Sequence, residues 1–360
     1  MINPLGSPVK VKVVGIGGGG GNAISRMLKS NIKDVDYLSL NTDSQVLKRQ
    51  SSVRQIGIGP NTTNGMGSGG HPEIGRKAIK ESSEAVAEAL SDTDLVFITA
   101  GMGGGTGTGA APYVAEIAKK RGALTVGIVT MPFSFEGPSR RAIAEHGLKS
   151  LSGKVDTVIK IENDRLLPSY NGGTKLDQAF RLADEVLRQG VQGISEIITR
   201  PGLINIDFAD VKSIISNAGS AFMAMGEAKG DKAGIEAARK ALANPLFETP
   251  IQGAQGILLN VRGSKNLTIG QVHEIADILR QSGNHEANII FGIVQERRLR
   301  DRDKVEVTLV ATGFQNHHGA KSFTNNFRQK SISASINVLE HNNQLNRADP
   351  LPIPAGMRLL

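Results

Sequence analysis

The 360-residue sequence contains no cysteine and no tryptophan, and only 4% of its residues are aromatic. Without cysteine, neither a disulfide framework nor a thiolate metal site can form. No apolar run approaches the roughly 18 to 20 residues that a membrane helix needs, and the N-terminus lacks the basic and apolar regions of a signal peptide. The sequence therefore predicts a soluble cytoplasmic protein, with enough hydrophobic residues for two domains with cores.

The formal charge of +8 is a feature that many nucleic-acid-binding proteins share. The basic residues are scattered along the chain, however, and no basic run is interleaved with aromatic side chains that could stack on bases. Direct binding of nucleic acid is therefore not expected, and the charge predicts at most a weak attraction to anionic surfaces.

Short apolar runs alternate with amphipathic stretches in the first half of the chain. Strands are expected at Val11–Ile16, Tyr37–Asn41, Leu95–Ala100, Leu124–Thr130 and Thr157–Ile161. Helical spacing lies between them, as in residues 23–30 and 72–90. Strands that alternate with helices predict right-handed crossovers and a parallel sheet, whose ligands bind beyond the carboxyl ends of the strands.

A long helix is expected over residues 176–199, where apolar side chains recur every three or four positions until Pro201 and Gly202 end the pattern. Further strands are expected at residues 256–261, 288–294 and 305–312, with a helix over residues 268–283. These elements predict a second, smaller α/β domain with its own core.

The last 46 residues differ in composition from the rest. Residues 315–348 are rich in Asn, Ser and Gln and poor in large apolar side chains, which predicts a disordered linker. The final segment, DPLPIPAGMRLL, again carries apolar side chains, spaced by prolines. An apolar patch after a linker is typical of a docking peptide; a frayed end without a role is the alternative.

Glycine is over-represented, since 43 of 360 residues is about 12% against an average near 7%. The excess gathers in three clusters: GIGGGGGN (residues 15–22), GMGSGGHPEIG (65–75) and GMGGGTGTG (101–109). Glycine lets backbone amides approach a ligand closely, helix N-termini favour anions, and Thr106 and Thr108 add hydroxyl donors. Three such loops predict a nucleoside triphosphate site, and the absence of G-x-x-x-x-G-K-[ST] excludes a P-loop.

The first cluster also leaves an alternative open. It contains G-x-G-x-x-G, and Asp43 follows the second expected strand, as in an NAD-dependent oxidoreductase with a Rossmann fold. The two additional glycine loops and the lack of a convincing catalytic histidine argue against that alternative.

The segment GGGTGTG (residues 103–109) is the signature of the tubulin and FtsZ superfamily, and the chain resembles bacterial FtsZ from about Val11 to Phe314. The other segments that carry the resemblance are GIGGGGGNA, NTDSQ, PFSFEGPSRR, NDRLL, FRLADEVLRQGVQGI and GLINIDFADV. The resemblance implies an α/β fold with a Rossmann-like parallel-sheet GTPase domain joined by a long central helix to a smaller α/β domain. It also implies a polymerising GTPase of the cell-division ring, with a filament in shape control or DNA partition as the alternative.

The resemblance implies the following domain boundaries: an N-terminal extension (1–10), a GTP-binding domain (11–175), the central helix (176–200), a C-terminal α/β domain with the catalytic loop (201–314), the linker (315–348) and a partner-binding peptide (349–360). The implied partners are other copies of the chain, in a head-to-tail polymer, and a membrane tether and division regulators that bind the peptide. The implied location is the division site, on the inner face of the membrane.

The resemblance also implies the residues that hold GTP or GDP. They are Gly17, Gly18, Gly19, Gly20, Gly21, Asn22, Ser68, Gly69, Gly70, Gly104, Gly105, Thr106, Gly107, Glu136, Arg140, Asn163, Phe180 and Asp184. The glycine loops hold the phosphates, Glu136 and Arg140 contact the ribose, and Phe180 stacks on guanine. Asp184 reads the base, and its chemistry fits, because an ionised carboxylate accepts from both N1–H and the 2-amino group of guanine.

The catalytic residues implied are Asn205, Asp207 and Asp210 in NIDFAD. The two aspartates are three residues apart, so one helical turn places both on one face, where they could orient water or hold a cation such as Mg²⁺. In the family this segment completes the nucleotide site of the next subunit. The sequence departs from the family at Ser68 (usually alanine), His71 (usually asparagine), Asn64 (commonly arginine) and Glu162 (typically proline).

Overall fold

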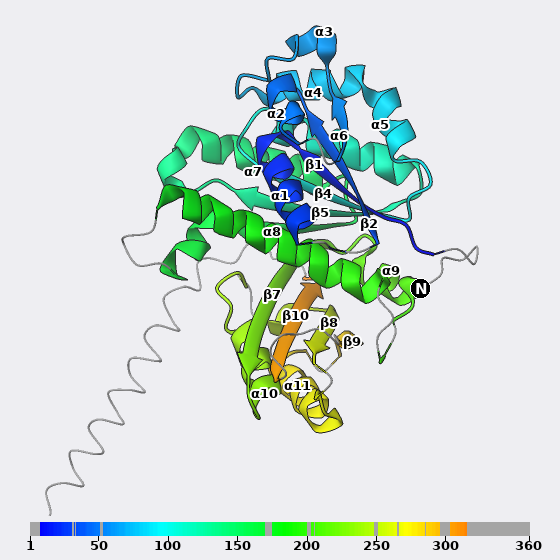
Figure 1. Cartoon of the computed structure of the whole chain (residues 1–360), viewed down its shortest axis with the longest axis vertical. Helices are drawn as coiled ribbons and strands as arrows, with labels where there is room; N and C mark the ends of the chain where they lie inside the picture. Colours follow the sequence, from blue (N-terminus) through cyan, green and yellow to red (C-terminus); the bar gives the residue numbers. More distant parts are fainter. Residues whose placement is uncertain are drawn as a thin grey trace, which may run out of the picture. The chain divides into compact units, whose positions relative to one another are not determined.

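The structure is a computed structural model of the chain, and it describes residues 8–30, 32, 34–50, 53–169, 175–199, 203–204, 206–247, 251–264, 266–284, 286–295 and 303–314 (Figure 1). The expected linker and peptide, residues 315–360, and the predicted catalytic residue Asn205 lie outside the described residues. The chain divides into the units Met1–Phe314 and Gln315–Leu360, and every described element belongs to the first.

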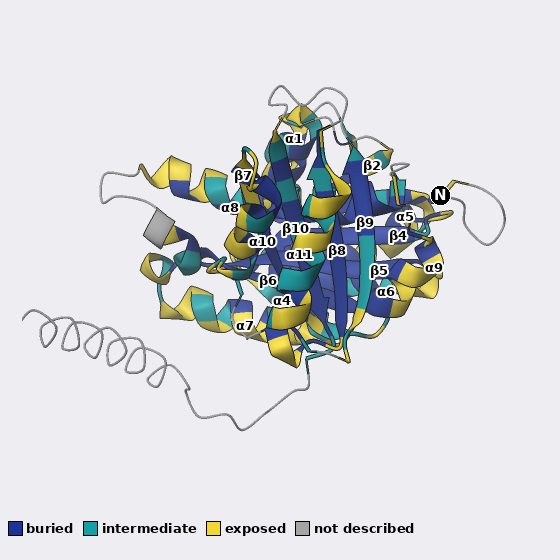
Figure 2. Cartoon of the chain, turned by 90° about the horizontal axis from the view of Figure 1, so that it is seen from below, coloured by how far each residue is buried: buried dark blue, intermediate teal, exposed yellow. Residues whose placement is uncertain are grey.

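Six strands pair in parallel to form the N-terminal part of the sheet, in the order β3-β2-β1-β4-β5-β6. Their bounds are β1 (Val11–Ile16), β2 (Val35–Asn41), β3 (Arg54–Gly57), β4 (Leu95–Gly101), β5 (Leu124–Met131) and β6 (Thr157–Glu162). All residues of β5 and nearly all of β4 are buried. These strands are continuous apolar runs because helices cover both faces of the sheet, as Figure 2 shows.

The helices of this part are α1 (Gly17–Lys29), α2 (Ser44–Lys48), α3 (Pro60–Thr63), α4 (Pro72–Glu81), α5 (Ser83–Ala89), α6 (Thr106–Lys120), α7 (Pro138–Ser152) and α8 (Leu176–Thr199). One core lies between the sheet and the pair α1 and α8, and includes Ile24, Met27 and Val191. A second core lies on the other face, beneath α4 to α7, and includes Ile79, Val114 and Leu151. Among the described residues, no helix is both long and apolar enough to span a membrane.

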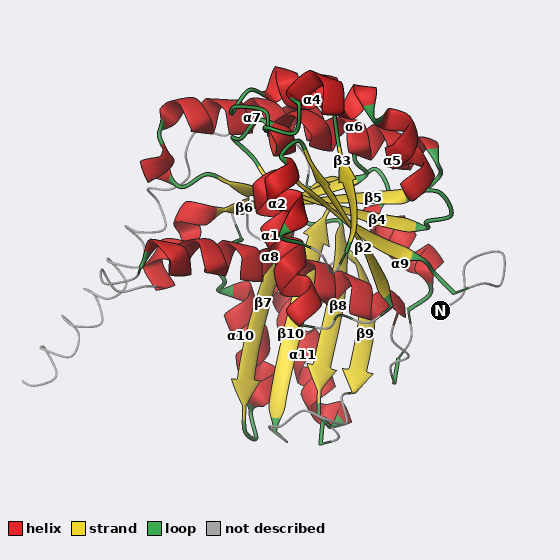
Figure 3. Cartoon of the chain, turned by 45° about the horizontal axis from the view of Figure 1, so that its top comes forward, coloured by secondary structure: helices red, strands yellow, loops and turns green. Residues whose placement is uncertain are grey.

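The C-terminal part contributes four strands, β7 (Gly219–Lys229), β8 (Gly256–Gly263), β9 (Asn288–Gln295) and β10 (Lys304–Thr312), and the helices α9 (Phe208–Ile215), α10 (Ala233–Leu242) and α11 (Ile269–Ser282). Strand β10 pairs antiparallel with β7 and β8, and β9 pairs parallel with β8 (Figure 3). A short parallel pairing of β6 with β7 joins the two parts into one ten-stranded sheet. Apolar residues of α10, α11 and the strands form a third core. The predicted fold class is confirmed.

Two predicted helices differ from the structure, and several elements were not predicted. The helix expected over residues 72–90 breaks at Ser82, whose hydroxyl accepts a hydrogen bond from the backbone of Gly59 at 3.0 Å. The first helix begins at Gly17 instead of Ala23, because its glycines pack directly against β1 and β4. Helices α2, α3, α6, α7 and α10 and strands β3 and β7 were not predicted from the pattern.

Candidate nucleotide-binding site

The three glycine loops meet at the carboxyl edge of the parallel strands and enclose a cavity of about 290 Å³. Fourteen of the predicted residues line it: Gly17, Gly18, Gly19, Asn22, Ser68, Gly104, Gly105, Thr106, Gly107, Glu136, Arg140, Asn163, Phe180 and Asp184. The other residues in the lining were not predicted, among them Ile16, Gly101 and Thr130 at or near the ends of strands. Ile16 and Gly101 belong to the glycine clusters, whereas Thr130 is marked in the sequence only by its position near the end of an apolar run.

Four predicted glycines do not line this cavity. A Cβ atom on Gly20 would lie 2.4 Å from the carbonyl oxygen of Thr99, so Gly20 permits the close approach of α1 to β4. Gly21 faces the side chain of Gln50. Gly69 and Gly70 are exposed in the loop that precedes α4, with φ angles of 59° and 81°. Gly20 and Gly21 thus serve the packing of α1, and Gly69 and Gly70 shape the loop ahead of α4; none of the four forms the wall of the cavity.

Asp43, the residue that kept an NAD site open as an alternative, also lies outside the lining. Its side chain caps α2 by accepting hydrogen bonds from the backbone of Gln45 and Val46, at 2.8 and 3.1 Å. An acid that reads a ribose must face the cofactor, and this one is committed to a helix N-terminus.

Two helix N-termini face the cavity, because α1 begins at Gly17 and α6 begins at Thr106. The first amides of a helix have no partner within it, and the helix dipole makes this end favourable for anions. Neither helix has an acidic residue in its first turn. This end of the cavity is therefore suited to phosphate groups.

Three buried hydroxyl groups connect the loops at the phosphate end. Thr106 Oγ1 lies 2.7 Å from Thr42 Oγ1 and 3.0 Å from Ser68 Oγ. Ser68, where the family usually has alanine, thus links the loop ahead of α4 to the first turn of α6. Thr108 does not line the cavity; its hydroxyl accepts from the backbone of Gly103 at 2.9 Å and closes the loop.

Phe180 is the aromatic residue in the described lining, and it packs against two further aromatic rings. The ring of Phe180 lies 5.3 Å from that of Phe133 and 6.4 Å from that of Phe135, edge to face in both pairs. Phe180 remains 39% exposed, which leaves ring surface available for a planar base. Glu136 and Arg140 form an ion pair at 3.1 Å beside these rings, and Glu136 also accepts from the backbone of Phe133.

Asn163 is only 4% exposed, and its side-chain carbonyl oxygen has no hydrogen-bond partner among the residues that the structure describes. A buried acceptor without a partner is uncommon and points to a missing ligand donor. Because Asn163 lines the cavity, a ribose hydroxyl or a base amino group bound there would supply that donor.

Glu162, which stands where proline is typical of the family, ends β6 directly before Asn163. Its carboxylate accepts two hydrogen bonds from Arg141, at 2.6 and 3.0 Å, and pairs with Lys160 at 2.8 Å. Burial alone would raise the pKa of Glu162, but Arg141 and Lys160 hold that pKa below its ordinary value. The charge is therefore stable inside the protein, and it fixes the end of β6 against α7.

Asp184 lies on α8 and pairs with Arg26 of α1, whose Nε is 2.9 Å from the carboxylate. Burial raises the pKa of Asp184 above its usual value, although the hydrogen bond from Arg26 acts in the opposite direction. The carboxylate is thus partly desolvated before any ligand binds. Glu136 and Asp184 are the acidic residues in the described lining, and neither belongs to a glycine loop.

The predicted catalytic aspartates lie elsewhere. Asp207 occupies the N-cap position of α9 without a capping hydrogen bond from its side chain, Asp210 lies in the first turn, and both side chains are exposed. The last residue of α9, Ile215, accepts a hydrogen bond from Thr157 at the amino end of β6, whereas the cavity lies at the carboxyl end. The six residues of β6 span about 20 Å. The aspartates therefore do not reach the cavity of their own chain.

Among the described residues, no group of three or more His, Cys, Asp or Glu side chains could hold a metal ion.

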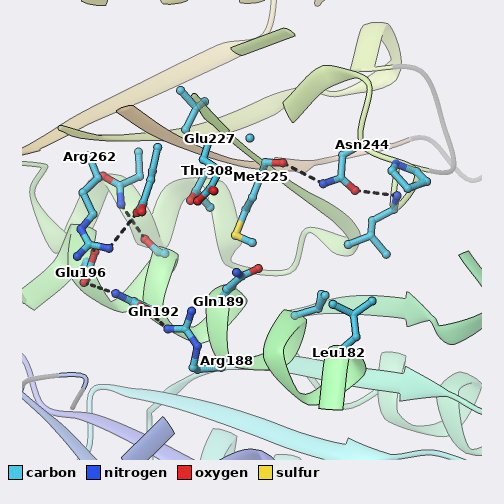
Figure 4. Close-up of a pocket in the computed structure, with 18 of the residues that line it drawn as sticks. Leu182, Arg188, Gln189, Gln192, Glu196, Met225, Glu227, Asn244, Arg262 and Thr308 are labelled. Carbon is cyan, nitrogen blue, oxygen red and sulfur yellow. Dashed lines mark hydrogen bonds and ion pairs between the residues drawn. The ribbon is translucent and has the colours of Figure 1, made fainter. Parts of the chain in front are cut away.

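A second cavity, of about 480 Å³, lies between α8 and the strands β7, β8 and β10 (Figure 4). A polar network runs along one side, where Arg188 donates to Gln192, Gln192 donates to Glu196, and Glu196 faces Arg262 of β8. None of the predicted site residues lines this cavity. The network ties the second half of α8 to the C-terminal strands, while the first half of α8 carries Phe180 and Asp184.

The chain matches two family models: the GTPase domain of the Tubulin/FtsZ family over residues 10–171 and the C-terminal domain of the FtsZ family over residues 219–315. Solved structures of FtsZ from M. jannaschii are similar. An empty dimer is 43% identical over 86% of this chain and 89% of that chain, with a TM-score of 0.82. A point mutant of the same FtsZ, with tyrosine in place of a tryptophan, is also 43% identical, over 86% of this chain and 92% of that chain, with a TM-score of 0.81.

A more distant likeness concerns CetZ2 from Haloferax volcanii, solved as a GTPγS-bound protofilament. It is 19% identical over 91% of this chain and 100% of that chain, with a TM-score of 0.73. At this identity the likeness shows a shared fold alone.

Proposed function

Because the chain belongs to the tubulin/FtsZ family of GTPases, we propose that it forms head-to-tail filaments of a cell-division ring and hydrolyses GTP where two subunits meet. The observation that carries the proposal is the position of the two halves of the site. The phosphate-binding loops lie at the carboxyl edge of the parallel strands, and the exposed pair Asp207 and Asp210 follows α8 at the amino edge.

In the proposed complex, the triphosphate lies against the first turns of α1 and α6, and guanine lies against Phe180. The carboxylate of Asp184 releases its hydrogen bond from Arg26 and accepts hydrogen bonds from the two donors of guanine. The side-chain carbonyl oxygen of Asn163 accepts a hydrogen bond from the nucleotide. Mg²⁺ is expected on the phosphates, with water and phosphate oxygens as ligands, where it neutralises charge that develops during hydrolysis.

Exposed apolar side chains support a contact between subunits. Eight large hydrophobic residues are exposed in the described part of the chain: Met66, Phe135, Leu167, Leu176, Phe180, Leu203, Ile204 and Ile269. The first five come from elements around the cavity. Leu203 and Ile204 lie just ahead of the aspartate pair, and Ile269 begins α11. A head-to-tail contact would bury apolar surface at both ends of each subunit.

The proposal is tested by measuring the rate of phosphate release from GTP and from ATP at several protein concentrations, with buffer alone as the blank. The specific activity with GTP should rise above a threshold concentration, because an isolated subunit holds half a site, and pelletable polymer should appear at the same threshold. A specific activity that is constant from well below to well above the polymerisation threshold would place the whole site in one chain.

The C-terminal peptide is the proposed contact for a membrane tether, since its apolar residues follow a long polar linker. Deleting residues 349–360 should abolish recruitment to membranes that carry the tether and leave GTP hydrolysis unchanged. Loss of hydrolysis in the isolated truncated protein would contradict a role confined to partner binding.

Base selection should depend on Asp184. Asp184→Asn offers guanine an amide in place of a carboxylate, so one guanine donor loses its acceptor at a cost of about 1 to 3 kcal/mol. GTP affinity should fall about 5- to 150-fold, while ATP affinity does not fall. The matched control is Asp177→Asn on the same helix, where the carboxylate is exposed and pairs with Arg181. An unchanged preference for GTP over ATP in Asp184→Asn would discard the assignment.

The pH dependence of binding provides a second readout of the same residue. GTP binds the ionised carboxylate, so affinity should fall as the pH decreases through the raised pKa of Asp184, at a higher pH than for an ordinary aspartate. The Asp184→Asn variant lacks this titrating carboxylate, so the pH dependence of its GTP affinity reports the nucleotide phosphates alone. Parallel profiles for the two proteins would show that Asp184 does not contact the base.

A further inference from the structure

The loop that leads to the aspartate pair is attached to the edge of the C-terminal sheet. The backbone of Leu203 donates to the carbonyl of Ile293 at 2.9 Å, and the backbone of Ile293 donates to the carbonyl of Ile204 at 3.4 Å. This short antiparallel bridge lies on β9, the last strand in the order of the sheet. The path of the chain just before α9 is therefore set by β9.

Ile206, the residue directly before Asp207, is buried against β9, with 3% of its surface exposed. It lies over Gly292. A Cβ atom at Gly292 would be 3.0 Å from Cδ1 of Ile206 and 3.6 Å from its Cγ1. A contact of 3.0 Å is tighter than about nine in ten Cβ contacts in proteins, so a side chain at residue 292 requires Ile206 to shift by a few tenths of an ångström.

The buried apolar face of α9 fixes which side chains the opposite face exposes to solvent. Phe208, Val211 and Ile214 join the core that includes Ile206, whereas Asp207 and Asp210 are exposed. Asp207 makes no capping hydrogen bond with its side chain. The direction of both carboxylates is therefore determined by how Ile206 and the apolar face of α9 are seated.

We propose that Gly292 is a positioning residue for GTP hydrolysis. The space that it leaves beside β9 seats Ile206, and the seated Ile206 directs Asp207 and Asp210 toward the nucleotide of the adjoining subunit. This inference rests on the proposed function, since it concerns the aspartates that complete the shared site. No residue of β9 lines the nucleotide cavity, so the effect on hydrolysis is separate from nucleotide binding.

The chain offers a matched control for a substitution at Gly292. Gly263 ends β8, which pairs with β9, and a Cβ atom there would lie 3.0 Å from Cβ of Leu267. Gly263→Ala thus introduces an equally short contact into the same sheet, away from the loop before α9. Comparing the two variants distinguishes the effect of displacing Ile206 from a general loss of stability in the C-terminal part.

The test measures nucleotide affinity, polymer formed with a non-hydrolysable GTP analogue, and hydrolysis per polymerised subunit. Gly292→Ala should bind GTP and polymerise as the unmodified protein does, and hydrolyse GTP at least about tenfold more slowly, because small misplacements of reacting groups have large effects on rate. Gly263→Ala should retain its rate within about twofold. Adding Ile206→Val to Gly292→Ala removes Cδ1, the atom in the shortest contact, and should restore most of the rate.

Mixing experiments distinguish positioning from loss of structure. Gly292→Ala still supplies a nucleotide, so mixing it with a variant that cannot bind nucleotide should restore hydrolysis, and mixing it with Asp210→Ala should not. A normal rate for Gly292→Ala, with Asp210→Ala inactive, would overturn this inference alone. If Asp210→Ala itself hydrolyses GTP normally, the proposed function fails with it.

Discussion

Replacing Asp210 with alanine should leave GTP affinity unchanged and slow GTP hydrolysis about 10²- to 10⁴-fold, the usual effect of removing a group that positions or activates water. The two effects separate because Asp210 is exposed in the first turn of α9, and the residues that line the nucleotide cavity come from other elements. Nucleotide titration and phosphate release, measured on the same preparation, check both expectations.

Glu236→Ala is the control for Asp210→Ala. Glu236 is also an exposed acid in the first turn of a short helix, α10, in the same C-terminal part. Its removal changes the charge and the helix terminus in the same way, without touching the aspartate pair. Equal hydrolysis rates for the two variants would remove Asp210 from the mechanism.

Gly105→Ala should lose GTP binding, since the new Cβ would lie 2.3 Å from Oγ of Ser68 and 2.7 Å from the backbone nitrogen of His71. Either α6 or the loop ahead of α4 must move, and amides that face the phosphates move with it. Two lost phosphate hydrogen bonds, at about 1 to 3 kcal/mol each, weaken binding roughly 30-fold or more.

Gly153→Ala tests whether a glycine substitution alone has this effect. A Cβ atom at Gly153, just after α7, would meet nothing closer than 3.8 Å. We expect GTP affinity to be unchanged in this variant. Near-normal binding by Gly105→Ala would mean that the contact between the two loops has no part in holding phosphate.

The parallel sheet and the cavity could be predicted because their signals are local. Buried parallel strands are continuous apolar runs, and glycine clusters at their carboxyl ends mark where the backbone approaches a ligand. The assignment of Glu136, Asn163 and Asp184 to the nucleotide site came from the resemblance instead, since a single carboxylate or amide on a helix or turn has no distinctive pattern. The structure adds that the side-chain oxygen of Asn163 is buried without a hydrogen-bond partner among the described residues. This depends on tertiary packing, which the sequence pattern does not reveal.

Elements that depend on tertiary contacts were missed. Helix α6 contains Gly107, Gly109 and Pro112, all unfavourable by intrinsic propensity, yet all three residues are buried. A Cβ atom at Gly109 would lie 2.0 Å from the carbonyl oxygen of Pro72, so glycine is required for α6 to pack against α4. The broken helix at Ser82 likewise depends on a bond to Gly59, a residue distant in sequence.

The separation of the phosphate loops from the aspartate pair is also a property of topology. The sequence places Asp207 soon after the long helix, but only the sheet order and the direction of β6 show that α9 ends at the opposite edge from the cavity. Glu162 is a different case: its partners Arg141 and Lys160 explain how a charge is tolerated where proline is typical.

A mixture of two inactive variants tests the central claim most directly. Asp210→Ala retains the nucleotide cavity, and Gly105→Ala retains the aspartate pair, so a contact between them rebuilds one whole site. Phosphate release should return on mixing, in proportion to the mixed contacts, once co-sedimentation shows that both variants enter the same filaments. If the two proteins co-assemble and no activity returns, the site is contained within one chain and the shared-site account is wrong.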